Sequence, residues 1–147
     1  MITCTFEDGG KAKLRHVVVD SLIVENNKIL LVRRAQNSYE FPGKLALPGG
    51  YVDLDETVEQ AVLREALEET GYRTKIVKFL KYIDDPKRTE RQTITFVFLL
   101  SPIKKVSKSD HEISEILWFP INKLPKKEKV AFDHLEIIQE YIKDLKH

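Results

Sequence analysis

The pattern of apolar positions along the chain predicts several strands and two helices. A run of β-branched and other apolar residues spans Arg15 to Val24, and a second run, Lys28 to Val32, follows the segment Glu25-Asn26-Asn27. Asparagine tolerates the left-handed backbone of a tight turn, so these two runs are expected to form a hairpin. Further strands are expected at the apolar segments 45–47, 74–83, 93–100 and 113–119.

Two other stretches show the spacing of amphipathic helices. In Asp53–Glu69, Asp53 and Asp55 are placed to cap the start, and Gly71 is placed to end the helix. In Ala131–Leu145, the apolar side chains recur at helical intervals: Phe132, Leu135, Ile138, Ile142 and Leu145. Strands interspersed with two helices predict an α/β fold in which the helices cover a mixed sheet.

Composition narrows the class of protein. The chain has 147 residues, 42% hydrophobic and 32% charged, which is typical of one globular domain spanning 1–147. Its net charge of +1 gives no global attraction to nucleic acid or to a membrane, and no partner of either kind is expected. Cys4 is the single cysteine, the four histidines lack ligand spacing, and no long apolar segment is present. We therefore expect no disulfide, no zinc site and no membrane span, and a reducing cytoplasm.

The helix predicted at 53–69 carries acids on its buried side. At about 100° per residue, Glu65 and Glu69 fall within about 20° of Val58, and Glu68 lies about 80° to one side. Val58 belongs to the apolar stripe that is expected to face the core: Val58, Ala61, Val62 and Ala66. Buried carboxylates without partners cost several kcal/mol each or take up protons.

Two interpretations of these acids remain open at this point. Arg64 can pair with one carboxylate, and a hard divalent cation such as magnesium would neutralise the others. The alternative is a solvated helix end with outward-pointing glutamates. The segment Pro48-Gly49-Gly50 favours the cation, because glycine lets bare backbone groups approach the acids closely.

These residues resemble a known signature. From Gly50 to Tyr72 the sequence is similar to the Nudix box: a glycine, five residues, Glu56, seven residues, then Arg-Glu-apolar-any-Glu-Glu-any-Gly-apolar. Tyr72 is a mild departure at the last apolar position. The segments LPGGYVD, DDPKRTER, WFP and AFDH extend the resemblance to about residues 15–146 and are similar to the subgroup of ADP-ribose pyrophosphatase-like enzymes.

The resemblance implies a Nudix-type α/β/α sandwich with a central mixed sheet, and a metal site. Glu65, Glu68 and Glu69 would coordinate Mg²⁺, or Mn²⁺, with help from the Gly50 carbonyl. Arg64 would hold a glutamate in place, and Glu56 would be structural or outer to the metal.

A carboxylate base is also implied, assisting attack of water on one phosphorus. Within the box, Glu65 is a candidate. In the downstream stretch the candidates are Asp110, Glu112 and Glu115, and Glu115 best fits the subgroup's pattern.

The implied activity is hydrolysis of the diphosphate linkage of a nucleoside diphosphate derivative, ADP-ribose or a similar nucleotide sugar. Arg33, Arg88 and Arg91 are candidates for binding the substrate, although each is also placed where a solvated arginine is common. Thr89-Glu90 stands where the subgroup has Asp-Pro, which weakens the case for ADP-ribose itself.

The sequence also agrees with two alternative functions and with one partner, a second copy of the chain. The first alternative is a sanitising hydrolase of oxidised or non-standard nucleoside triphosphates. The second is a Nudix domain that senses a ligand without catalysis. A homodimer is a further expectation, with Met1 to Lys13 as a segment that would either add a strand or contact a partner.

Overall fold

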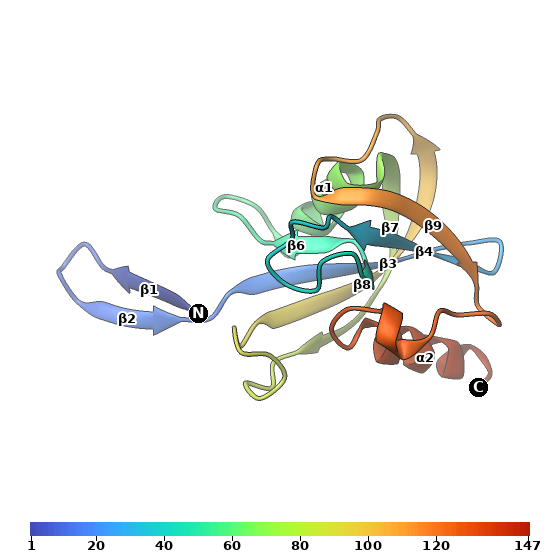
Figure 1. Cartoon of the computed structure of the whole chain (residues 1–147). Helices are drawn as coiled ribbons and strands as arrows, with labels where there is room; N and C mark the ends of the chain where they lie inside the picture. The colour runs from blue at the N-terminus through green and yellow to red at the C-terminus, as the bar shows by residue number, and fades with distance from the viewer.

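The computed structural model describes every residue from Met1 to His147, with a sheet between two helices (Figure 1). The helices are α1 (Val58–Thr70) and α2 (His134–Leu145), and a short 3₁₀ helix, η1 (Lys127–Lys129), precedes α2. The strands are β1 (Ile2–Thr5), β2 (Lys11–Leu14), β3 (Val17–Glu25), β4 (Lys28–Arg34), β5 (Leu45–Ala46), β6 (Gly49–Tyr51), β7 (Tyr72–Ile83), β8 (Ile94–Lys105) and β9 (Ile113–Pro120).

The main sheet is mixed, as expected. Its strand order is β5-β4-β3-β8-β7, with β6 also paired to β3 and β9 also paired to β4. β3 and β8 are parallel, whereas β3–β4, β4–β9 and β7–β8 are antiparallel. The predicted turn is present, because Asn26 and Asn27 both have positive φ between β3 and β4.

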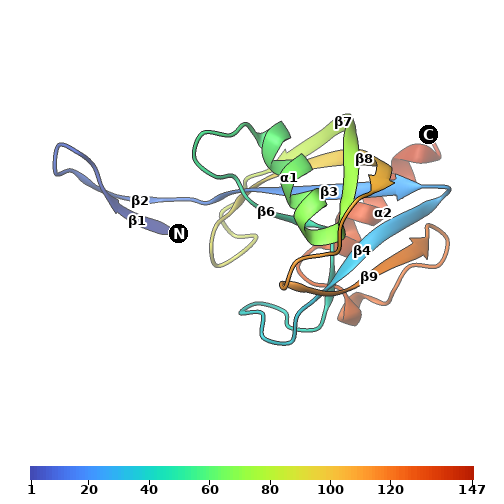
Figure 2. The same cartoon turned by 90° about the horizontal axis from the view of Figure 1, so that it is seen from above.

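Alternate residues of the central strands supply two cores, one on each face of the sheet. Ile23 and Leu30 pack with Ala61, Val62 and Ala66 of α1 on one face. Leu22, Ile29 and Leu31 pack with Ile137 and Ile138 of α2 on the other. A strand buried on both faces reads as a continuous apolar run, which explains the composition of β3 and β4. Figure 2 shows α1 and α2 on opposite sides of the sheet, and the expected α/β/α sandwich is confirmed.

Both helices start later than the sequence pattern predicts. α1 begins at Val58 rather than Asp53, because Asp55 has a left-handed φ of 64° that no helix accommodates. Thr57 is the cap: its hydroxyl accepts from Gln60 N at 3.1 Å, and Gln60 Oε1 accepts from Thr57 N at 2.8 Å. The predicted end is correct, since Gly71 closes α1 with φ 73°. α2 likewise begins at His134 rather than 131, after Phe132 at φ 54°.

Residues 1–14, where a further strand or a partner contact was expected for Met1 to Lys13, form a hairpin of two strands. β1 pairs with β2 in a separate sheet, and the hairpin extends away from the rest of the protein (Figure 1). We call residues 1–14 the arm. Its exposed apolar side chains are Met1, Ile2, Phe6 and Leu14. Neither helix is long and apolar enough to cross a membrane.

Candidate active site

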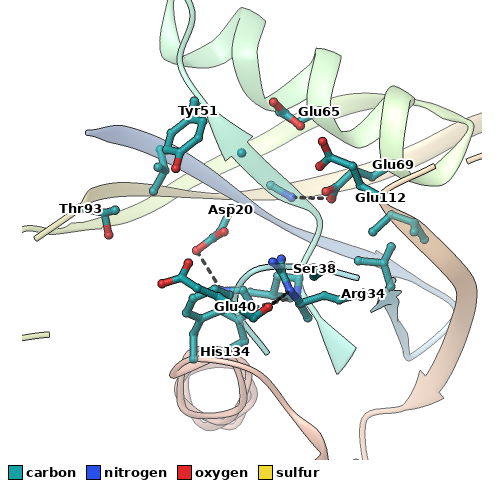
Figure 3. A pocket seen from close by; sticks show the side chains of 18 of the residues that line it. Asp20, Arg34, Ser38, Glu40, Tyr51, Glu65, Glu69, Thr93, Glu112 and His134 are labelled. Atoms are coloured by element: carbon teal, nitrogen blue, oxygen red, sulfur yellow. Dashed lines mark hydrogen bonds and ion pairs between the residues drawn. The ribbon is translucent and has the colours of Figure 1, made fainter. Parts of the chain in front are cut away.

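A cleft of about 570 Å³ opens between α1 and the start of α2. Its floor is the stretch of β3, β6 and β8 that α2 leaves uncovered, and residues 37–40 and 88–95 contribute the side walls. Figure 3 shows Glu65, Glu69 and Glu112 on one side of this space and Asp20 and His134 on the other. The cleft therefore joins residues from elements far apart in the sequence.

The backbone of Leu47–Gly50 crosses the cleft floor and is held from both sides. Gly49 N donates to Glu69 Oε2 at 2.9 Å, and Leu47 N donates to His134 Nδ1 at 2.9 Å. A side chain at Gly50 would place its Cβ 2.4 Å from Glu65 Oε1. Only glycine lets this backbone lie against the acids, which is the close approach that the sequence predicted.

Two of the three box glutamates point inward. Glu69 is 5% exposed and the Glu65 side chain is 15% exposed, whereas the Glu68 side chain is 48% exposed. Burial raises the pKa of Glu69 well above its usual value despite the hydrogen bond from Gly49, and the charge of Glu65 adds to the shift. Burial also raises the pKa of Glu65, against the hydrogen bond from Arg64. The side of the cleft that Glu65, Glu68 and Glu69 form, the acid wall, thus carries a surplus of negative charge.

Arg64 connects the acids to the backbone of β6. Its guanidinium donates to Glu56 Oε1 at 2.6 Å, to Glu65 Oε1 at 2.8 Å, to Glu68 Oε2 at 3.2 Å and to the Tyr51 carbonyl at 3.0 Å. The hydrogen bonds from Arg64 lower the pKa of Glu56 to about 2. Those with Glu56 raise the pKa of Arg64 in turn, so this cation stays charged and fixed.

The donor chemistry of this wall fits a hard divalent cation. Its side chains offer carboxylate oxygens, and burial leaves the charges of Glu65 and Glu69 only partly offset by the protein. In this arrangement no three acidic, histidine or cysteine side chains converge on one point. Glu65 and Glu68 line the cleft and also contact Arg64, so an ion would compete with Arg64 for their oxygens. Glu65, Glu68, Glu69 and the Gly50 carbonyl stay the predicted ligands.

The structure places Glu115 and Arg33, two of the predicted site residues, outside the lining of the cleft. They pair with each other at 2.8 Å across β9 and β4, and neither lines the cleft. The register of β9 on β4 pairs Glu115 with Arg33, and it shifts between Arg33 and Arg34, so that Arg34 pairs with Ile113 of the cleft lining. Arg34, next to Arg33, does line the cleft, where it donates to the Glu40 carbonyl at 2.9 Å.

Asp110 and Glu112 occupy the place that the sequence assigned to Glu115. Asp110 N donates to the Glu68 carbonyl at 2.9 Å, and the Glu112 carbonyl accepts from Ala35 N at 2.9 Å. These bonds tie the segment before β9 to the end of α1 and to the residue after β4, and both acids line the cleft. Their charges contribute to the raised pKa of Glu69.

The other two predicted substrate ligands line the cleft but have partners within the protein. Arg88 donates to both oxygens of Asp133, at 2.6 and 2.7 Å, and to Thr95 Oγ1 at 2.6 Å. Burial opposes its charge, yet the bonds to Asp133 raise its pKa. Arg91 lies at the cleft mouth, where it donates to the Tyr51 hydroxyl and lies 5.4 Å from the centre of the Tyr39 ring. Substrate contact by Arg88 and Arg91 stays a prediction.

Sequence reasoning missed Asp20 and His134 as cleft residues. Asp20 is the one acid inside the apolar run of β3, and His134 stands at the start of α2. A lone charge in a run that is otherwise buried was the available signal. It gave no partner, because only the packing of α2 onto the sheet brings His134 to within 3.3 Å of Asp20.

Comparison with known proteins agrees with this geometry. The profile of the NUDIX domain family matches residues 14–141. The chain belongs to the Nudix family. It is 43% identical over 128 residues to an ADP-ribose pyrophosphatase of Methanocaldococcus jannaschii, an alignment that covers 86% of this chain and 73% of that protein.

Solved structures of Nudix proteins share the fold. A NUDIX domain of Shewanella oneidensis NrtR complexed with ADP ribose has a TM-score of 0.74 and 27% identity, with 91% of this chain and 90% of that chain covered. A bifunctional NMN adenylyltransferase/ADP ribose pyrophosphatase from Francisella tularensis, complexed with AMP and a Mn ion, also has a TM-score of 0.74, at 29% identity. That alignment covers 90% of this chain and 42% of the Francisella chain.

Proposed function

We propose that this protein hydrolyses the diphosphate linkage of a nucleoside diphosphate derivative, ADP-ribose or a similar nucleotide sugar, with Mg²⁺. The observation that carries the proposal is the inward-facing pair Glu65 and Glu69 beside the Gly49-Gly50 backbone. The relative named an ADP-ribose pyrophosphatase and the ADP ribose complex of a Nudix domain support the substrate class. Mn²⁺ is the alternative ion, on the strength of the Francisella complex.

The residues divide the chemistry between the walls of the cleft. A divalent ion held by Glu65, Glu68, Glu69 and the Gly50 carbonyl would neutralise diphosphate oxygens and increase the acidity of water. Arg64 sets the positions of the acids through Glu65 and Glu68.

We assign Glu112 as the base that takes the proton of the attacking water. It lines the cleft opposite Asp20, as Figure 3 shows, and it is not committed to any ion pair. Glu65 is the second candidate, but it is also a predicted metal ligand, and Arg64 donates to it at 2.8 Å.

A substrate panel with Mg²⁺ tests the reaction. ADP-ribose should give AMP and ribose 5-phosphate, and NADH, dinucleoside polyphosphates and oxidised triphosphates should be poorer substrates. Release of diphosphate from an oxidised triphosphate, with ADP-ribose untouched, would establish the sanitising alternative. Binding of ADP-ribose without turnover would establish the sensing alternative.

Glu112→Gln and Glu115→Gln form a matched pair for the base. We expect Glu112→Gln to lower kcat by about 100-fold or more, because general-base contributions are of that size. Glu115→Gln should keep kcat, because its partner is Arg33 outside the cleft. Equal losses in the two variants would contradict the assignment of Glu112.

The proposal includes one Nudix domain over 1–147 that works as a homodimer in the cytoplasm. Cys4 has no cysteine to pair with, which suits a reducing compartment. An isolated two-stranded hairpin is marginally stable in water. The arm also exposes apolar side chains, so a second copy of the chain would bury them.

A further inference from the structure

Asp20 and His134 form a buried polar pair at the end of the cleft opposite the box glutamates. Asp20 is 8% exposed and His134 is 4% exposed, and both line the cleft. Asp20 comes from β3 and His134 is the first residue of α2, so the pair lies where α2 stops covering the sheet (Figure 3). Nothing in the proposed metal chemistry uses either side chain.

The hydrogen bonds of His134 fix which of its nitrogens carries the proton. Leu47 N–H donates to Nδ1 at 2.9 Å, so Nδ1 is the unprotonated acceptor. The proton of the neutral ring is then on Nε2, which lies 3.3 Å from Asp20 Oδ2. Nε2 of His134 therefore faces one oxygen of Asp20, and the other oxygen stays unpartnered.

The second oxygen, Oδ1, has no donor from the protein. It lies against Gly49, where a Cβ would be only 2.6 Å away, so no side chain intervenes there. The charge of Asp20 acts on Arg88, but the three nitrogens of Arg88 already donate to Asp133 and Thr95. An unpartnered carboxylate oxygen on the cleft lining is free to accept a hydrogen bond from a bound ligand.

We propose that Asp20, oriented by His134, is a specificity-determining subsite that accepts a hydrogen bond from a hydroxyl or amino group of the bound nucleotide. The identity of the ligand as a nucleotide rests on the proposed function. A carboxylate repels phosphate and binds neutral donors, and ribose hydroxyls are the donors next to a diphosphate. Gly49 pairs with Asp20 in the sheet and donates to Glu69 Oε2, so only this glycine separates the subsite from the box glutamates. A sugar attached to a diphosphate held at the glutamates therefore reaches Asp20.

Asp20→Asn is the direct test. Because Nε2–H of His134 faces the nearer atom, the asparagine turns its carbonyl oxygen to His134 and its amino group to the cleft. The variant thus replaces an acceptor by a donor at the same place. We expect KM for ADP-ribose to rise about 10- to 100-fold, which corresponds to the loss of one hydrogen bond to a charged group, with kcat within a few-fold of the wild type.

Calorimetric binding of the two product halves, AMP and ribose 5-phosphate, locates the donor. One of them should bind about 10- to 100-fold more weakly to Asp20→Asn than to the wild type. If that one is AMP, IMP and 2′-deoxy-AMP separate the amino group from the hydroxyl, since each lacks one of them. Unchanged affinity for both halves would overturn the proposal.

Two substitutions of His134 separate its two contacts. Asparagine keeps an acceptor for Leu47 N–H and loses the donor to Asp20, so His134→Asn should raise KM as Asp20→Asn does. Glutamine keeps a donor to Asp20 and loses the acceptor for Leu47. The loss of that acceptor loosens the Leu47–Gly50 backbone, which carries the predicted metal ligand Gly50. His134→Gln should therefore keep the affinity for the product half and raise the Mg²⁺ concentration needed for half-maximal activity. Identical effects of the two variants would show that His134 only packs, and would overturn its positioning role.

The outcomes distinguish this inference from the proposed function. If the wild type hydrolyses no nucleotide sugar but binds a product half in an Asp20-dependent way, the reaction fails and the subsite stands. If the wild type hydrolyses ADP-ribose and Asp20→Asn matches it in KM and in product affinity, the reaction stands and the subsite falls. Should Asp20→Asn not fold, His134→Asn carries the same comparison.

Discussion

Glu69 is a buried acid whose charge the protein offsets with one backbone hydrogen bond, from Gly49. Such a group costs stability in the metal-free protein and becomes favourable only when a cation binds beside it. Function and stability are therefore opposed at this one residue. Glu68, a near neighbour on the same helix but half exposed, carries no comparable cost.

Replacing Glu69 by glutamine should raise metal-free stability and abolish turnover. The raised pKa means that the folded state binds more protons than the unfolded state above the ordinary value of 4.5. Wild-type stability therefore falls as pH rises through that window, and Glu69→Gln does not follow this fall. We expect the variant to gain about 1–3 kcal/mol at pH 8 in EDTA, by denaturant unfolding.

The control for that variant is Glu68→Gln, which should change metal-free stability little. Both variants should lower kcat by about 100-fold or more with Mg²⁺. Near-normal activity in both would refute the assignment of these glutamates as metal ligands. A loss of stability in Glu69→Gln would contradict the account of its burial.

The contribution of Glu56 to folding stability depends on pH with the opposite sign to that of Glu69. Its pKa is lowered to about 2 by the hydrogen bonds from Arg64, so its contribution to stability is complete above pH 4.5 and is lost as pH falls toward 2. Thermal unfolding of Glu56→Gln should lie below the wild type at pH 7 and approach it between pH 4.5 and 2. Glu59→Gln, in the first turn of α1 and without an ion pair, should follow the wild type throughout. A gap that stays constant with pH would count against the Arg64 contact.

At the scale of elements, α1 depends on its cap at Thr57 rather than on the aspartates before it. Asp55 is held with positive φ, so the chain turns at that point and the helix starts afterwards. The capping box of Thr57 and Gln60 then satisfies both backbone N–H groups that it can reach.

Thr57→Ala should therefore lower the free energy of unfolding by about 1 kcal/mol, the usual value for loss of a cap. Asp53→Ala is the matched control, because the Asp53 side chain is exposed and only a 3.5 Å contact to Arg64 is lost. Its effect should stay below about 0.5 kcal/mol, measured by urea denaturation. Equal losses in the free energy of unfolding would show that Asp53 stabilises the start of the helix as much as Thr57 does.

At the scale of the whole molecule, the arm is the part whose apolar side chains the rest of the chain does not bury. It extends from the sandwich with its apolar side chains exposed, while both faces of the main sheet are covered by helices (Figures 1 and 2). Contact of the arm with its own chain includes one hydrogen bond, from the Met1 amino group to the Arg91 carbonyl at 3.2 Å. A second copy would remove the exposed apolar surface from water.

The combined substitution Ile2→Lys and Phe6→Lys should shift the protein from dimer to monomer in light scattering. Lysine keeps the arm soluble and opposes burial of its apolar positions. Leu54→Lys is the control, since Leu54 is 90% exposed on the loop before α1. A wild type that is monomeric at all concentrations would refute the homodimer, whatever the variants do.

The sequence by itself determined the α/β class and the spacing of the acids on α1, because both depend on local patterns, and the resemblance to the Nudix box implied the sandwich. Alternation in β3 and β4 and helical spacing in α1 decide which side chains face the cores, and the same spacing turns Glu65 and Glu69 inward. Tertiary structure alone decided the rest of the cleft. Whether Glu112 or Glu115 faces it depends on how β9 pairs with β4, and the contact of Asp20 with His134 exists only because α2 packs on the sheet. Such contacts join residues with no fixed spacing in the chain, so no local pattern contains them.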